Sequence, residues 1–252
     1  MPADYDCVYL SPHLDDAVLS CGGRIWEQVQ AGLKVLIVTF MGGDAPELLS
    51  PFARRFHLMC ALDEQAMAIR REEDLKVCRQ LGVDARHFLL HDAIYRRNGS
   101  TFMYPSHRAV MRNLHPADTI VAQELASLMD RIPLHTERVA PLAIGGHVDH
   151  QLVRRAAERR WGRNLLFYED FPYAMKWMSA WKATRPHTHW EPVHVRLSEE
   201  AVQARIDGIS GYESQIEMLF GGPDRMLDQV RRFIFSREGE RYWRRRSGAP
   251  MA

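Results

Sequence analysis

The sequence predicts an α/β fold, a doubly wound and mostly parallel sheet followed by C-terminal helices. Short, continuous apolar runs such as "CVYL" (7–10) and "KVLIVTF" (34–40) are typical of strands buried on both faces of a parallel sheet. Stretches with helical periodicity separate these runs, and this alternation predicts right-handed strand–helix–strand crossovers. Helical periodicity also fills most of the chain beyond residue 199.

In the first half of the chain, glycines mark the ends of two helical patterns. Gly32 and Gly82 each follow the last residue of an apolar repeat, where a left-handed residue commonly ends a helix. We predict strands at 7–10, 34–40 and 87–90, helices at 15–30 and 63–82, and loops at 41–62 and 93–107.

The second half continues the alternation and then becomes helical. We predict helices at 117–132 and 147–161, strands at 137–144 and 164–170, an edge strand at 192–198, and C-terminal helices at 199–220 and 223–235. We expect one domain over residues 1–252, with its C-terminal helical part at about 199–252.

Composition excludes several classes of function. The chain has 252 residues, 46% of them hydrophobic, and 33 basic residues stand against 32 acidic ones. This balance gives no reason to expect nucleic acid as a partner. No apolar run is long enough to span a bilayer, and the N-terminus does not resemble a signal peptide, so we expect a cytoplasmic protein without membrane contact. The four cysteines lack CxxC spacing and are interpreted as small buried hydrophobic residues; homo-oligomerisation is left open.

Three polar turns follow predicted strands and therefore meet at one edge of the sheet. They are "SPHLDD" (11–16), "GGHVDH" (145–150) and "FYEDFPY" (167–173). Ligands of open parallel sheets bind beyond the carboxyl ends of the strands, so these turns predict a site. No GxGxxG is present in the first turn, which argues against a dinucleotide.

The residue types in these turns favour a zinc site. Imidazole and carboxylate groups are good zinc ligands, and His13 and Asp16 are three residues apart across a turn. His147 and His150 share one helical face, and a further ligand is expected there. Asp15 would then be free to act as a general base. Alternatively, Asp15 or Asp16 merely caps a helix, and the paired histidines lie on a solvated helix face.

The combination of motifs resembles a known family. "SPHLDD" resembles the PHPDD motif of the LmbE-like, PIG-L-type zinc deacetylases, and "HVDH" is similar to their later HPDH-like motif. "AIRREEDLKVCRQLG" resembles the family's R-x-x-E helix, and "LLHDAIYR" its segment after the third strand. The resemblance covers roughly residues 6–220.

The resemblance implies a Rossmann-like fold and the removal of an N-acyl group from an N-acetylglucosamine-type substrate. It implies that His13, Asp16 and His150 bind Zn²⁺ and that Asp15 is the general base. His147 would stabilise the oxyanion or protonate the leaving amine. The remaining implied roles are substrate binding by Arg70 and Asp92 and orientation of His147 by Asp149. Leu14 and Ala17 depart from the family's usual proline and glutamate.

The substrate is expected to be a small amino sugar or a glycoconjugate. Hydrolysis of a thiol-sugar or antibiotic-sugar conjugate is an alternative, as is a non-catalytic sugar-binding domain. Other candidates are weaker. They are Tyr168, Glu169, Asp170 and Asp44 at strand ends, a second metal site at His187, His189 and His194, a stacking wall of Trp177, Trp181 and Trp190, and an anion site among the arginines of 231–246.

Overall fold

A seven-stranded sheet forms the centre of the molecule. The computed structural model describes residues 5–60, 65–132, 137–176 and 178–247. The strand order is β3-β2-β1-β6-β7-β9-β8, and β3, β2, β1, β6 and β7 pair in parallel. The strands are β1 (Cys7–Ser11), β2 (Val35–Thr39), β3 (Asp84–His87), β6 (Glu137–Pro141), β7 (Leu166–Tyr168), β8 (Trp190–Val195) and β9 (Glu240–Arg245). The predicted α/β class and mostly parallel sheet are confirmed.

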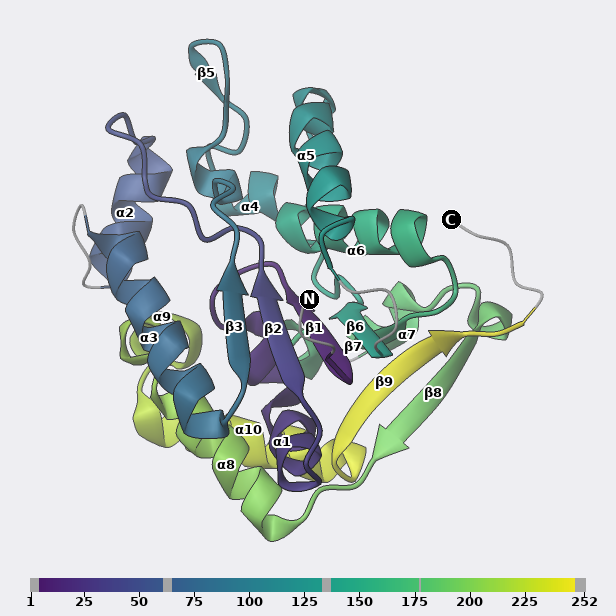
Figure 1. The fold of residues 1–252 in the computed structure, drawn as a ribbon. Coiled ribbons are helices and arrows are strands. Elements are labelled where there is room, and N and C mark those ends of the chain that lie inside the picture. The colour runs from purple at the N-terminus through teal and green to yellow at the C-terminus, as the bar shows by residue number, and fades with distance from the viewer. Residues whose placement is uncertain (1–4, 61–64, 133–136, 177, 248–252) are drawn as a thin grey trace.

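Helices cover both faces of this sheet (Figure 1). Helices α1 (Asp16–Gln30), α3 (Ala66–Leu81) and α8 (Glu199–Ser210) lie on one side, and α5 (Thr119–Met129) and α6 (Val148–Trp161) on the other. Successive residues of β1 point to opposite faces of the sheet. Tyr9 packs in a cluster with residues of α1 and α3, and Leu10 packs in a cluster with residues of α5 and α6. This burial on both faces explains the continuous apolar runs of the sequence.

The C-terminal region adds two more helices and a strand. Helices α9 (Glu213–Phe220) and α10 (Pro223–Arg237) follow α8, and β9 then runs antiparallel between β7 and β8. The prediction of a helical tail is wrong for 240–245. The many arginines of this segment are unusual for a strand. Two of them are paired within the fold, because Arg241 donates to Glu169 and Arg245 donates to Glu158.

Two other elements differ from the sequence prediction. The third strand lies at 84–87, earlier than the predicted 87–90, because an edge strand tolerates polar residues whereas Leu89 is 66% exposed. Residues 51–59, predicted as loop, form helix α2 (Pro51–Met59). Ser50 caps it by accepting a hydrogen bond from Ala53, and Pro51 occupies the first turn.

Short elements complete the connections. They are η1 (Ala93–Tyr95), the hairpin β4 (Arg97–Asn98) and β5 (Thr101–Phe102), α4 (His107–Val110), η2 (Pro116–Asp118), η3 (Tyr173–Met175), α7 (Ser179–Ala183) and η4 (His187–His189). No helix among the described residues is long and apolar enough to span a membrane. All four cysteines are free and buried, as predicted. The single-domain organisation stays a prediction.

Candidate metal centre and active site

The three predicted turns meet at the carboxyl ends of β1, β6 and β7. The first turn is fixed by Ser11, whose hydroxyl donates to the carbonyl of His13 at 2.6 Å and accepts from the amide of Ala17 at 3.1 Å. The amide of His13 donates to Asp16 Oδ2 at 2.9 Å. Leu14 and Ala17, which depart from the family motif, are both 1% exposed and pack into the core around the turn.

His13, Asp16 and His150 bring three ligand atoms together. His13 Nδ1 lies 3.1 Å and His150 Nε2 lies 3.2 Å from the same oxygen, Asp16 Oδ2. All three side chains are buried, so the histidine pair does not lie on a solvated helix face. Asp15 is the residue before α1, but its side chain makes no capping hydrogen bond. The two structural alternatives from the sequence are therefore not supported.

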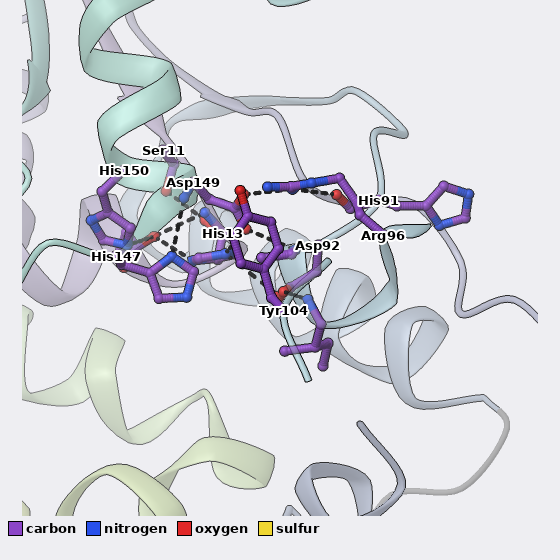
Figure 2. Close-up of polar contacts among 12 residues, drawn as sticks. Ser11, His13, His91, Asp92, Arg96, Tyr104, His147, Asp149 and His150 are labelled. Atoms are coloured by element: carbon purple, nitrogen blue, oxygen red, sulfur yellow. Dashed lines mark hydrogen bonds and ion pairs between the residues drawn. The ribbon is translucent and has the colours of Figure 1, made fainter. Parts of the chain in front are cut away.

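The second ring nitrogen of each of these two histidines faces another carboxylate. His13 Nε2 lies 3.0 Å from Asp149 Oδ2, and His150 Nδ1 lies 2.7 Å from Asp170 Oδ1 (Figure 2 shows His13, Asp149 and His150). In metal sites such carboxylates hold the proton on the outer nitrogen and leave the inner lone pair for the metal. His150 Nε2 is buried and makes no hydrogen bond of acceptable geometry. This orphaned atom beside Asp16 fits a divalent metal ion.

A second group, His13, His147 and Asp149, is also close enough to share an ion. In this group both oxygens of the Asp149 carboxylate already accept hydrogen bonds. Oδ1 accepts from Arg96 at 2.6 Å, and Oδ2 accepts from the amide of Ala93 at 3.0 Å. His147 Nδ1 accepts the amide hydrogen of Asp149 at 3.2 Å. The group His13, Asp16 and His150 therefore has the more available ligand atoms.

Asp15 lies at the cavity floor beside these residues. Its carboxylate is 3.4 Å from Arg70 Nη2, and both side chains are nearly buried. Burial raises the pKa of the Asp15 carboxyl to about 6, while the guanidinium of Arg70 opposes this rise. A carboxylate with this pKa is suited to accept and return a proton.

His147 caps helix α6 and also lines the cavity. Because its Nδ1 accepts a backbone hydrogen bond, the proton of the neutral ring resides on Nε2. Burial, together with the neighbouring His13, holds the pKa of His147 well below its usual range. The ring is thus a neutral donor. Asp149 was expected to orient His147. The contact between these two residues is the hydrogen bond from the backbone amide of Asp149, whereas the carboxylate of Asp149 contacts His13.

Arg96 extends the site in a way that the sequence did not reveal. Its guanidinium donates to Asp149 through Nη1, and to both oxygens of Asp118 through Nε and Nη2, each at 2.9 Å. Tyr104 also donates to Asp118 (Figure 2 shows Arg96 and Tyr104). These buried charges form a chain from η2 to His13. No spacing in "AIYRRN" distinguishes Arg96 from its exposed neighbour Arg97.

A cavity of about 770 Å³ opens above these residues. Its polar floor includes the two residues predicted to bind substrate, Arg70 and Asp92. Oδ1 of Asp92 accepts the amide hydrogen of Ile94 at the start of η1. The other oxygen of Asp92, Oδ2, then lies 3.5 Å from His13 Nε2. Both predicted loops, 41–62 and 93–107, contribute residues to the lining of the cavity.

Comparison with known proteins places this site in a family. The family model described as PIG-L, GlcNAc-PI de-N-acetylase, matches residues 8–161. The chain belongs to the PIG-L family. This segment contains both motifs, from "SPHLDD" to "HVDH", and the predicted family is confirmed.

Curated relatives in the same comparison are deacetylases. A 2'-N-acetylparomamine deacetylase of Niallia circulans is 26% identical over 260 residues, which cover 94% of this chain and 93% of the relative. A second 2'-N-acetylparomamine deacetylase, of Streptomyces fradiae, is 32% identical over 171 residues, covering 66% and 56% of the two chains.

Solved structures of deacetylases share the fold over nearly the whole chain. The zinc-inhibited form of teicoplanin deacetylase Orf2 has a TM-score of 0.81 at 26% identity and covers 96% of this chain and 99% of its own. The A40926 pseudoaglycone deacetylase Dbv21 has a TM-score of 0.73 at 28% identity, covering 98% and 100%. As predicted, the relatives of this PIG-L protein are N-deacetylases, which hydrolyse amides.

The weaker candidates that the structure describes do not line the cavity of this PIG-L protein. Asp170 supports His150, whereas Glu169 is buried against Arg237 and Arg241, and Tyr168 bonds the carbonyl of Leu10. Asp44 pairs with Arg71. Trp190 is a core residue, Trp181 is 41% exposed, and Trp177 lies outside the described residues. Within the described part of the chain, His187, His189 and His194 form no group with metal-ligand spacing.

Proposed function

We propose that this protein is a zinc-dependent hydrolase that removes an N-acyl group, acetyl in the simplest case, from an amino sugar. The observation that carries this proposal is the convergence of His13, Asp16 and His150 beside Asp15 and His147 at the floor of one cavity. A non-catalytic sugar-binding domain would not require a metal-ligand group together with a second buried carboxylate, that of Asp15, next to it. Membership of the PIG-L family supports the same reaction.

Zinc is the metal that the donor set favours. Two imidazoles and one carboxylate are a common protein ligand set of catalytic zinc, and one solved relative is described as a zinc-inhibited form. When bound, zinc supplies Lewis acidity, which polarises a carbonyl group and lowers the pKa of water. His13, Asp16 and His150 would hold it, with Asp149 and Asp170 orienting the two imidazoles.

The other residues of the floor provide proton transfer and hydrogen bonding. Asp15 accepts a proton from the attacking water, and Arg70 keeps its carboxylate in place. His147 donates its Nε2 hydrogen to the oxygen that becomes negative as the amide carbonyl is attacked. The departing nitrogen needs a proton to leave as an amine, and Asp15 returns the proton it received from water. Water is thereby consumed, and a carboxylic acid and an amine are formed.

The substrate is an N-acetylglucosamine-type amino sugar within a small molecule or glycoconjugate. Arg70 and Asp92 at the cavity floor are suited to bind sugar hydroxyls. Among the alternatives, an antibiotic-sugar conjugate is favoured over a thiol-sugar because the relatives named above act on paromamine, teicoplanin and A40926 compounds. A cytoplasmic location stays a prediction, and the oligomeric state stays open.

The experiment that tests the function is a deacetylation assay with the zinc-loaded protein. N-acetylglucosamine, 2'-N-acetylparomamine and N-acetylglucosaminyl glycopeptides are incubated with it, and the release of acetate and of free amine is measured. We expect stoichiometric acetate and amine from at least one of them, and release at least about 10²-fold slower by Asp15→Asn protein. Absence of release across the panel would contradict the proposal.

A further inference from the structure

Residues 169–174 lead from the end of β7 into the wall of the cavity. Tyr173 lines the cavity, and Asp170 Oδ1 lies 2.7 Å from Nδ1 of the candidate ligand His150. The family model matches residues 8–161 and does not reach this segment. The contacts that hold residues 169–174 in place therefore bear on the metal centre although they lie outside the matched part of the chain.

Three successive residues of this segment are tied to three different parts of the fold. Glu169 bonds to β9 and α10, and the Asp170 carboxylate also accepts the amide hydrogen of Ile144 at 2.8 Å. Phe171 donates its backbone amide hydrogen to Ser20 Oγ at 3.1 Å. Because successive side chains of a strand point to opposite sides, Glu169 faces β9 and α10 while Asp170 faces the metal centre. An anchored Glu169 thus restricts the backbone that carries Asp170.

The Glu169 carboxylate is buried and accepts three hydrogen bonds from the C-terminal elements. Oε1 accepts from Arg241 Nε at 2.6 Å and from Trp243 Nε1 at 2.9 Å. Oε2 accepts from Arg237 Nε at 2.9 Å. Hydrogen bonds between a carboxylate and guanidinium groups are short and strong, so this anchor is well defined.

The pairing of β7 with β9 brings these donors to Glu169. The two strands are antiparallel, and Tyr168 lies opposite Tyr242. The same register places Glu169 opposite Arg241, one residue further along each chain. Figure 1 shows β9, at the yellow end of the chain, beside the sheet strands of the first half. The last described strand is therefore bonded to the residue next to Asp170.

We propose that Glu169 is a positioning residue of the metal centre. Its bonds to α10 and β9 hold Asp170 against Nδ1 of His150 and so orient the ring whose Nε2 faces Asp16. Glu169 itself does not line the cavity and belongs to no group with metal-ligand spacing. This inference rests on the proposed function and extends its metal centre to residues 237–243.

The variant Glu169→Gln tests this role. Glutamine keeps the size of the side chain but loses the charge that the two arginines share. The side chains of Arg237 and Arg241 are 19% and 22% exposed, so water reaches them and the fold is expected to survive. We expect the Kd for zinc, measured by competition with a chromogenic chelator, to rise at least about threefold, less than for loss of a residue that bonds a ligand directly.

Glu158→Gln is the matched control. Glu158 is also buried and also accepts from an arginine of β9, Arg245, at 2.8 Å, but it lies on α6 and does not adjoin Asp170. Both variants are expected to lower the urea midpoint of unfolding. Only Glu169→Gln is expected to change the zinc Kd by more than about twofold. Equal increases of Kd in the two variants would show that Glu169 acts through stability alone and would overturn the proposal.

A double-mutant cycle tests whether Glu169 acts through Asp170. Asp170→Ala removes the contact with Nδ1 of His150. In this background Glu169→Gln is expected to change the zinc Kd by less than about twofold. An increase as large as in the wild-type background would refute the proposed route. The comparison with Glu158→Gln does not depend on the folding of Asp170→Ala.

The same zinc titrations separate this inference from the proposed function. Wild-type protein that binds zinc, together with an unchanged Kd in Glu169→Gln, would overturn the inference and leave the function intact. A raised Kd in Glu169→Gln, together with no amide release by the zinc-loaded wild type, would contradict the function and support the inference. Wild-type protein that binds no zinc would overturn both.

Discussion

The Asp149 carboxylate lies 3.0 Å from Nε2 of His13, a residue 136 positions earlier in the chain. This contact joins the start of α6 to the turn after β1, and it fixes the ring so that Nδ1 faces Asp16. Asp170 does the same for His150. The candidate metal centre therefore depends on two carboxylates that would not bind the metal themselves.

Replacing these carboxylates should weaken metal binding without abolishing it. In Asp170→Asn, the side chain still accepts the Nδ1 hydrogen of His150, but without its negative charge. We expect the zinc affinity to fall by about 10-fold to 100-fold, as measured by competition with a chromogenic chelator. Asp44→Asn is the matched control, because Asp44 is exposed and pairs only with Arg71. An unchanged affinity in Asp170→Asn would show that Asp170 does not tune a ligand.

Arg96 should be required for stability as well as for the site. It neutralises two buried carboxylates, Asp149 and Asp118, and its loss leaves both charges without a partner. We expect Arg96→Met to lower the free energy of unfolding by about 3–5 kcal/mol in urea denaturation. Arg97→Met, at the exposed neighbouring position, should change it by less than about 0.5 kcal/mol. Equal effects of the two substitutions would refute this role of Arg96.

Asp15→Asn should separate catalysis from metal binding. The amide has the same shape as the carboxylate but does not accept a proton from water. We expect kcat to fall by about 10²-fold to 10⁴-fold while the zinc content stays at the wild-type level. Steady-state kinetics and metal analysis of the same preparation check this. Loss of zinc together with activity would instead make Asp15 a ligand.

His147→Gln should lower kcat more than it raises KM. A glutamine amide does not reproduce the direction of the Nε2 hydrogen, so the developing negative charge on oxygen loses a donor. We expect a loss of about 10²-fold to 10³-fold in kcat. If KM alone rises, His147 contributes to substrate binding and not to the reacting atoms.

The sequence was most informative where one turn holds several functional residues. His13, Asp15 and Asp16 lie within the six-residue turn 11–16. Because this turn follows a buried strand, its position predicted the site and placed it at the carboxyl ends of the parallel strands. Asp170 was only a weak candidate, because its role depends on which ring nitrogen of His150 it meets. Arg96 went unnoticed, since nothing in its local pattern shows that it pairs with Asp149, 53 positions away.

Strands and helices were also predicted where the local sequence pattern determines them and missed where distant contacts do. Elements buried on both faces, such as β1 and β2, were predicted from continuous apolar runs, whereas β9 was missed because its arginines are neutralised by Glu169 and Glu158 from distant segments. Helix α2 was missed because its apolar stripe is short, and Phe52 and Phe56 both pack against a distant cluster around Leu14 and line the cavity. In each case the missing information lay in tertiary contacts.

The zinc stoichiometry of two histidine variants tests the central assignment most directly. His150→Asn retains a donor for Asp170 but removes the Nε2 lone pair beside Asp16, whereas His147→Gln leaves the group His13, Asp16 and His150 intact. The proposed ligand set predicts zinc well below one per chain for His150→Asn after dialysis, because a ligand atom is lost, and one zinc per chain for His147→Gln. Full zinc occupancy in His150→Asn, with loss of zinc in His147→Gln, would contradict it and assign the metal to His13, His147 and Asp149.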